Sequence, residues 1–173
     1  QKDIFLNEIT KFLPFYKISA EILNNKVIGF TRNKEQEMPP NEHLILNSDI
    51  AYLTLSIDKN NQYQESSHTL SKENWAINRK ILGDHQIELQ ETGKYRPHEL
   101  GQNNTRVSFN KGCFKGQEII ARMEYLGKLK KETRLITHSN QKEVSEFIII
   151  GQSYQDQETI FSSCFGKKDS FSK

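Results

Sequence analysis

Residues 111 to 118 read KGCFKGQE and place a cysteine between two lysine-glycine pairs. The residues that follow, IIARMEYLG, have the apolar spacing of a helix, so Cys113 is expected close to a helix N-terminus. The positive end of the helix dipole and the cations Lys111 and Lys115 all favour a thiolate over a thiol. Glu118 would oppose this effect if it faced the sulfur, or it would cap the free amides of the helix. The motif therefore indicates a reactive cysteine.

Two other interpretations of Cys113 remain open at this stage. A buried, inert cysteine whose neighbouring glycines serve a turn would give the same local sequence. A metal ligand is less favoured, because Cys164 lies far along the chain, no C-x-x-C or C-x-x-H spacing occurs, and the five histidines are dispersed. The sequence thus predicts no metal site.

A loop followed by a helix is the simplest structure that would position this cysteine. Gly112 and Gly116 permit backbone conformations that other residues avoid, and would shape the loop. We expect the helix to bury one apolar stripe and to end at Gly127 in a left-handed cap. The stripe comprises Ile119, Ile120, Met123 and Leu126.

The segments on either side of the motif are predicted to differ. Residues 83–110 are polar and contain glycines and a proline, which predicts a long irregular connection of the kind that is functional or disordered. Residues 129–138, LKKETRLITH, alternate well enough for a strand.

The rest of the chain predicts short strands and two helices. The expected elements are a helix over 4–16, a hairpin over 17–30 that turns at Asn24-Asn25, a polar loop over 32–42, paired strands over 43–46 and 51–57, and a helix from Ser71 that stops at Gly83. The fold class expected from this order is α+β, with a small β-rich C-terminal region.

Composition limits the function classes. The 173 residues carry 24 basic and 22 acidic side chains, a net charge of +2, so no global charge favours nucleic acid. The basic cluster of Lys128, Lys130, Lys131 and Arg134 is interrupted by Glu132 and is equally well explained by an exposed strand edge. No apolar run approaches the ~20 residues of a transmembrane helix, and the N-terminus lacks a secretory layout, so a cytoplasmic protein is the default.

Three further residues are given ordinary structural roles. Trp75 has helical spacing and is expected in the core, and Cys164 is expected to pack as a small apolar group. His98, in a polar loop, is expected to be exposed.

The segment KGCFKGQEIIAR resembles the K-G-C-Y-x-G-Q-E signature of the YgfZ family, folate-binding proteins related to the aminomethyltransferase (T-protein) of the glycine cleavage system. The resemblance includes Trp75 with Arg79, YRPHELG at 95–101, YLGKLKK at 125–131 and, more weakly, KFLPFYKISAEI at 11–22. Two features depart from the family. Phe114 replaces its usual tyrosine and lacks the hydroxyl, and nothing here matches the family's long N-terminal portion, which suggests that the sequence starts inside a longer protein.

The resemblance implies a partial T-protein/YgfZ-like folate-binding domain over 1–131, followed by a short β-barrel-like region over 132–173. It implies tetrahydrofolate as cofactor, and an accessory role in the assembly or repair of iron-sulfur enzymes, including those that modify tRNA. The implied partners are folate and iron-sulfur client or assembly proteins, without a membrane and without direct nucleic-acid binding.

The same resemblance assigns roles to the motif. Cys113 is the implied functional thiol, with Lys111 tuning its charge. The implied folate-binding residues are Gly112, Phe114, Gly116, Gln117, Glu118 and Arg122. For Arg122, an exposed ion pair with Glu118 is an equal alternative. Two other functions stay open: a folate-dependent aminomethyl or methyl transferase, and a thiol redox or persulfide relay. Whether the protein is an enzyme is left open as well.

Overall fold

A computed structural model describes the chain except residues 1, 24, 60–68, 113–115 and 173. It is an α+β protein, as predicted, built on two separate three-stranded antiparallel sheets. The first sheet has the order β1-β3-β2, and the second has the order β4-β6-β5. The strands are β1 (Lys26–Asn33), β2 (His43–Asn47), β3 (Ala51–Asp58), β4 (Lys131–His138), β5 (Ile148–Asp156) and β6 (Thr159–Lys167).

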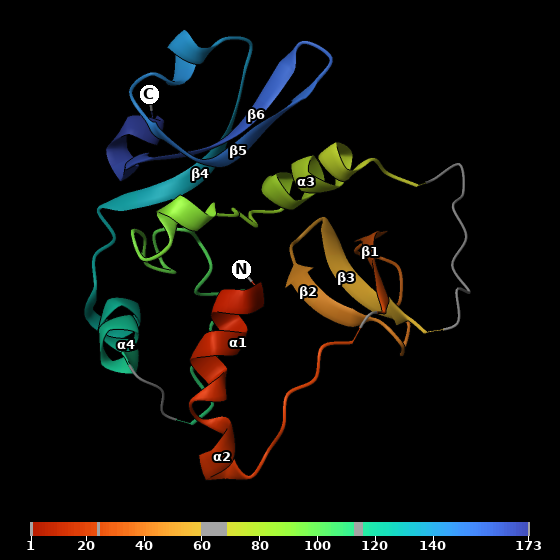
Figure 1. Ribbon diagram of the computed structural model, residues 1–173. Helices are drawn as coiled ribbons and strands as arrows, with labels where there is room; N and C mark the ends of the chain where they lie inside the picture. Colours follow the sequence, from red (N-terminus) through yellow and green to blue (C-terminus); the bar gives the residue numbers. More distant parts are fainter. Residues whose placement is uncertain (1, 24, 60–68, 113–115, 173) are drawn as a thin grey trace.

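Helix α3 lies between the two sheets (Figure 1). The α-helices are α1 (Lys2–Thr10), α2 (Leu13–Tyr16), α3 (Lys72–Ile81) and α4 (Gln117–Leu126). Three short 3-10 helices are η1 (Leu89–Glu91), η2 (Gln141–Val144) and η3 (Lys168–Ser172). The described part of the chain contains no helix that is both long and apolar enough to cross a membrane.

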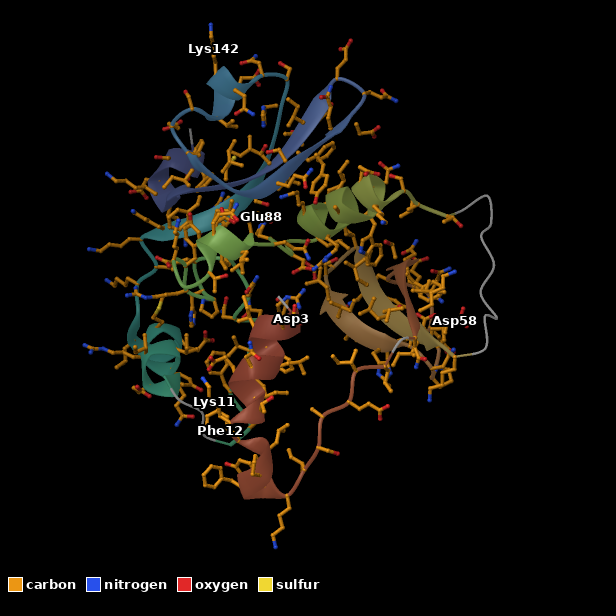
Figure 2. All side chains as sticks on the ribbon, viewed as in Figure 1. Asp3, Lys11, Phe12, Asp58, Glu88 and Lys142 are labelled. Carbon is orange, nitrogen blue, oxygen red and sulfur yellow. The ribbon has the colours of Figure 1, made fainter. Side chains whose placement is uncertain are left out.

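The N-terminal helix is shorter than predicted, and the hairpin that should follow it is not formed. The helix expected over 4–16 divides into α1 and α2, and Pro14 sits in the first turn of α2, where its missing N–H costs nothing. Lys11 and Phe12 mark this division in Figure 2. Residues 18–23 form no strand, and β1 pairs with β3 instead, so the predicted hairpin is wrong. Its turn residue Asn24 lies outside the described residues.

The first sheet confirms the pairing of the two strands predicted over 43–46 and 51–57. β3 is the central strand and buries Leu53 and Thr54 completely. β1 runs into the region predicted as a loop, because its pairing with β3 continues to Asn33 opposite Ala51.

Helix α3 begins and ends where the sequence predicts. The Ser71 side chain accepts a hydrogen bond from the Asn74 backbone N–H at 3.0 Å, which is an N-cap. Beyond the last turn, Gly83 has φ of +82°. Trp75 is half-buried against Gly29 of β1, where a Cβ atom would lie 2.6 Å from the indole ring. A glycine on β1 thus makes room for the tryptophan of α3.

The irregular connection over 83–110 is largely confirmed, and it packs on the second sheet. Apart from η1, it has no regular element. Leu100 forms a core with Ile150 and Phe165, and the Tyr95 ring contacts Phe165 edge-on with centroids 5.0 Å apart. The C-terminal region is β-rich as predicted, but its three described strands form an open sheet and not a closed barrel.

Candidate functional site

Helix α4 begins within the KGCFKGQE motif, whose last two residues, Gln117 and Glu118, form its first turn, so the helix predicted at this point is present. Its N-cap is Gly116, whose φ of +86° strongly favours glycine. Lys111 and Gly112 are exposed, and a Cβ atom at Gly112 would meet no atom within 4 Å. Cys113 and Phe114 lie outside the described residues. The loop-then-helix prediction is therefore confirmed at Gly116.

The apolar stripe of α4 is not buried, contrary to prediction. No residue of α4 is buried; Ile119 is 54% exposed and Leu126 is 80% exposed. The helix end also differs from the predicted left-handed cap, because Gly127 has φ of −82°. Glycine is required there for space, since a Cβ atom would lie 2.6 Å from the Met123 carbonyl oxygen.

The apolar stripe of α4 is not buried because one face of the helix borders a cavity of about 470 Å³ and not a core. Residues from the 96–98 turn, α4 and the linker to β4 converge on it. The lining residues are Arg96, His98, Ile119, Arg122, Met123, Leu126, Gly127, Lys128 and Leu129. The four aliphatic side chains give it apolar walls, while the two arginines and the lysine give it positive charge. Such a mixed site suits an anionic ligand with an apolar body.

His98 forms the polar wall of the cavity. It is 8% exposed, so the prediction of an exposed loop histidine is wrong. Its Nε2 lies 2.9 Å from Oε2 of Glu124 on α4, and because a carboxylate only accepts, Nε2 carries the hydrogen. The other ring nitrogen, Nδ1, is buried without a partner in the described structure. The pair fixes the 96–98 turn against α4.

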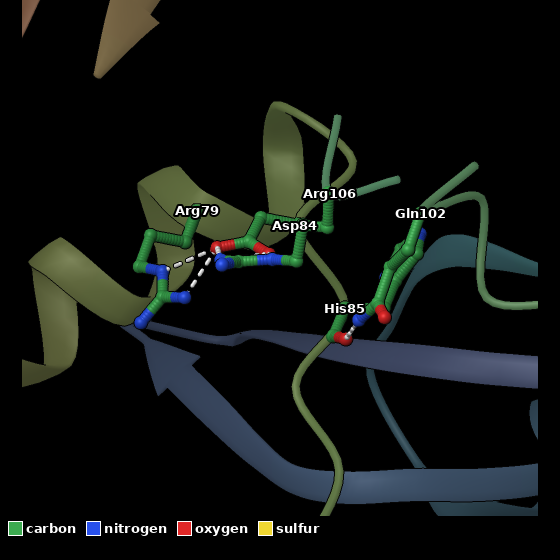
Figure 3. A network of polar contacts seen from close by, with 5 residues as sticks. All are labelled: Arg79, Asp84, His85, Gln102 and Arg106. Carbon is green, nitrogen blue, oxygen red and sulfur yellow. Dashed lines mark hydrogen bonds and ion pairs between the residues drawn. The ribbon is translucent and has the colours of Figure 1, made fainter. Parts of the chain in front are cut away.

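A buried carboxylate, that of Asp84, joins the end of α3 to the segment that precedes the motif (Figure 3). Asp84 is almost fully buried and accepts from the Nε of Arg79 at 2.7 Å and from Nη2 of Arg106 at 2.8 Å. The Gln102 side chain donates to the His85 carbonyl at 3.0 Å. These contacts tie residues 102–106 to the end of α3, and so position the segment that leads to the motif.

A second buried polar cluster joins α3 to β6. The Lys80 ammonium donates to the Ser163 hydroxyl at 2.7 Å, and that hydroxyl lies 2.9 Å from Nδ1 of His85. Lys80 and His85 are each 4% exposed. Burial lowers the pKa of Lys80, and burial together with the Lys80 charge lowers the pKa of His85 to about 4. His85 is therefore neutral at pH 7, and its Nδ1 is hydrogen-bonded to the Ser163 hydroxyl.

Cys164 lies beside this cluster and is confirmed as a packed, inert thiol. It is fully buried, and burial raises its pKa to about 11. A thiol of this kind is neither ionised nor accessible at neutral pH.

The chain is similar in sequence to three curated proteins that share one name, tRNA-modifying protein YgfZ. One from Aliivibrio fischeri is 27% identical over 181 aligned positions, covering 91% of this chain and 57% of the relative. One from a second strain of that species is 28% identical, covering 76% and 47%, and one from Colwellia psychrerythraea is 39% identical over 36% of this chain and 20% of the relative. The chain is related to the YgfZ family. No family model matches it.

The relationship to YgfZ confirms the family that the motif predicted. The chain spans about half the length of the two Aliivibrio YgfZ proteins. The activity, substrates and partners of the whole protein are therefore matters for proposal.

The structure separates the residues that the sequence predicted to bind folate. Arg122 lines the cavity, whereas Gln117, Glu118, Gly112 and Gly116 do not. The alternative ion pair between Glu118 and Arg122 is not formed in the described structure. Among the described residues that were predicted to bind folate, Arg122 is thus the one that lines the cavity.

Sequence reasoning missed several residues that build the site. Arg96 and His98 were inside the quoted stretch YRPHELG, but only folding brings them to α4. The sequence feature that could have identified His98 was a carboxylate partner on α4. The two residues are far apart in the sequence, so a local pattern does not pair them. Lys128 was placed in a basic cluster for which an exposed strand edge was an equally good explanation, and it lies before β4 and lines the cavity.

Proposed function

We propose that this chain is a folate-binding accessory protein that supports the assembly or repair of iron-sulfur enzymes, including those that modify tRNA. The observation that carries the proposal is the positively charged cavity on α4, the helix that begins at Gln117 within the KGCFKGQE motif. The relationship to proteins named tRNA-modifying protein YgfZ supports the link to tRNA modification.

The residues of the cavity fit the acidic end of a folate. The guanidinium of Arg122 matches a carboxylate in shape and charge, and Arg96 and Lys128 add two cations. No acidic side chain is among the described lining residues, although the Glu124 carboxylate is bonded to the lining residue His98. We infer that these three side chains bind the carboxylates, with Gln117 and Glu118 contacting the remainder of the ligand. A reduced folate would supply a carrier for one-carbon groups.

Cys113 is proposed as the functional thiol. The N-cap of α4, Gly116, is three residues after Cys113 in the sequence, and Lys111, two residues before Cys113 in the sequence, is exposed. A helix N-terminus and a neighbouring ammonium both stabilise a thiolate, whereas Cys164 is buried with a raised pKa. The two cysteines thus differ in the environment that controls reactivity.

The proposed architecture is a partial T-protein-like folate-binding domain over 1–131, followed by a short C-terminal region over 132–173. The first sheet lies within the former range, and the second sheet begins at its boundary. Packing of Tyr95 and Leu100 on the second sheet joins the two regions.

Thermal unfolding with tetrahydrofolate tests the proposed function. At a ligand concentration one hundred times the Kd, binding adds about 2.7 kcal/mol, which raises the Tm by roughly 5 to 10 °C for a chain of this size. Arg122→Ala and Glu118→Ala are expected to reduce this rise. Lys142→Ala, on the exposed η2 helix labelled in Figure 2, is the control and should keep it. The absence of any rise at millimolar tetrahydrofolate would reject the proposal.

The role of the thiol needs a separate experiment. Cys113→Ala is expected to retain the tetrahydrofolate-dependent rise in Tm and to lose support of an iron-sulfur enzyme in a complementation assay. Full complementation by Cys113→Ala would show that the thiol is dispensable. Turnover of an aminomethyl or methyl donor by the wild-type chain would instead identify a folate-dependent transferase.

A further inference from the structure

We propose that the cavity on α4 binds the acidic tail of its ligand and not its ring, and that it selects tails that carry several carboxylates. The inference rests on the proposed function for the identity of the ligand, which is a folate. The selectivity itself is argued from the lining of the cavity.

The first argument is the local charge. The whole chain is nearly neutral, with 24 basic and 22 acidic residues, yet three cations and no carboxylate line the cavity among the described residues. Arg96, Arg122 and Lys128 come from three different segments, and none of them forms an ion pair with a described residue. Mutual repulsion of these cations is relieved when a ligand with more than one negative charge binds.

The second argument is the shape and chemistry of the walls. Among the described residues, no phenylalanine, tyrosine or tryptophan lines the cavity to stack on a flat heterocycle, and no lining carboxylate accepts hydrogen bonds from ring nitrogens. The walls are aliphatic, formed in part by Ile119 and Met123. A chain of glutamyl units alternates methylene groups with carboxylates, so its methylenes can contact these walls while its carboxylates meet the guanidinium groups.

The third argument is the buried nitrogen of His98. Nε2 of His98 donates to Glu124, and the other ring nitrogen, Nδ1, is buried without a hydrogen-bond partner among the described residues. A buried polar atom without a partner is uncommon in native proteins. The amide groups that link glutamyl units contain both an N–H donor and a carbonyl acceptor, so they can form a hydrogen bond with Nδ1.

The test compares tetrahydrofolate that carries one glutamyl unit with the same compound carrying three, by calorimetric titration of the full chain. Exposed ion pairs change affinity by up to about fivefold each, so the triglutamate is expected to bind roughly 10- to 25-fold more tightly. The ratio should fall as ionic strength rises, because the cations are exposed. Equal affinities would overturn the inference and leave the proposed function intact.

Matched variants assign the effect to the cavity. Arg96→Gln, Arg122→Gln and Lys128→Gln are each expected to reduce the ratio severalfold. Lys130→Gln, two residues from Lys128 but outside the lining, should preserve it. An unchanged ratio in all three cavity variants would overturn the inference.

A fragment without the ring distinguishes the inference from the proposed function. p-Aminobenzoyl-triglutamate is expected to bind the wild-type chain and to lose affinity in Arg122→Gln. Binding of this fragment without binding of either tetrahydrofolate would support the tail site and reject the folate function. Failure of the fragment and of both tetrahydrofolates to bind would reject both.

Discussion

Protonation of His85 is expected to destabilise the fold in a defined pH range. Its pKa is about 4 in the folded chain against an ordinary value of 6.5, because it is buried beside the Lys80 ammonium. Between pH 6.5 and pH 4, His85 therefore binds a proton in the unfolded chain but not in the folded chain. This stabilising contribution is complete above pH 6.5, falls as the pH decreases towards 4, and is constant below that value.

The magnitude follows from the difference between the two pKa values. At 1.36 kcal/mol for each unit, a difference of about 2.5 units corresponds to roughly 3 kcal/mol in total, of which about 2 kcal/mol is lost between pH 7.5 and pH 5.0. With a urea m-value near 2 kcal/mol/M, the midpoint of unfolding should fall by about 1 M over this range.

Urea unfolding of the wild-type chain and His85→Asn at both pH values is the assay. Asparagine keeps an acceptor for the Ser163 hydroxyl but does not titrate, so the variant should lose about 2 kcal/mol less than wild type as the pH falls. His43→Asn, at an exposed position, should behave as wild type. Equal losses in His85→Asn and wild type would refute the assignment of the buried neutral histidine.

Three other perturbations have defined outcomes. Asp84→Ala leaves Arg79 without its buried carboxylate and should lower the free energy of unfolding by about 3 kcal/mol in urea titrations; a loss below 1 kcal/mol would contradict the burial of the pair. Gly29→Ala places a methyl group against the Trp75 ring and should cost about 1 to 3 kcal/mol, measured by the same titration, and no loss would contradict the contact. Iodoacetamide should label Cys113 rapidly at pH 7, and a rate no higher than that of free cysteine would argue against thiolate stabilisation.

Local patterns predicted the elements whose signals are short-ranged. Ser71 and Gly83 bound α3 because capping and termination depend on residues within one turn. The pairing of β2 with β3 was equally accessible, since a short turn joins the two strands. The alternation over 17–23 did not produce a strand because a strand also needs a partner to pair with. One edge of β3 pairs with β2, and its other edge pairs with β1.

The candidate site depended on contacts that local patterns do not contain. The apolar spacing of α4 predicted a buried stripe, but spacing cannot tell a helix that faces a core from one that borders a cavity. His98 was taken as exposed because its partner, Glu124, lies on a different element. Arg122 was identified through the family motif, and its neighbours Arg96 and Lys128 became part of the site only through tertiary structure.

Helix α3 contacts the first sheet through an aromatic ring and the second sheet through a charged hydrogen-bond donor. The Trp75 ring lies against Gly29 of the first sheet, and the Lys80 ammonium is bonded to Ser163 of the second. A tilt of this helix that improved one contact would disturb the other. We therefore expect the two sheets to be energetically coupled through α3, so that local unfolding of one sheet would weaken the contacts of the other.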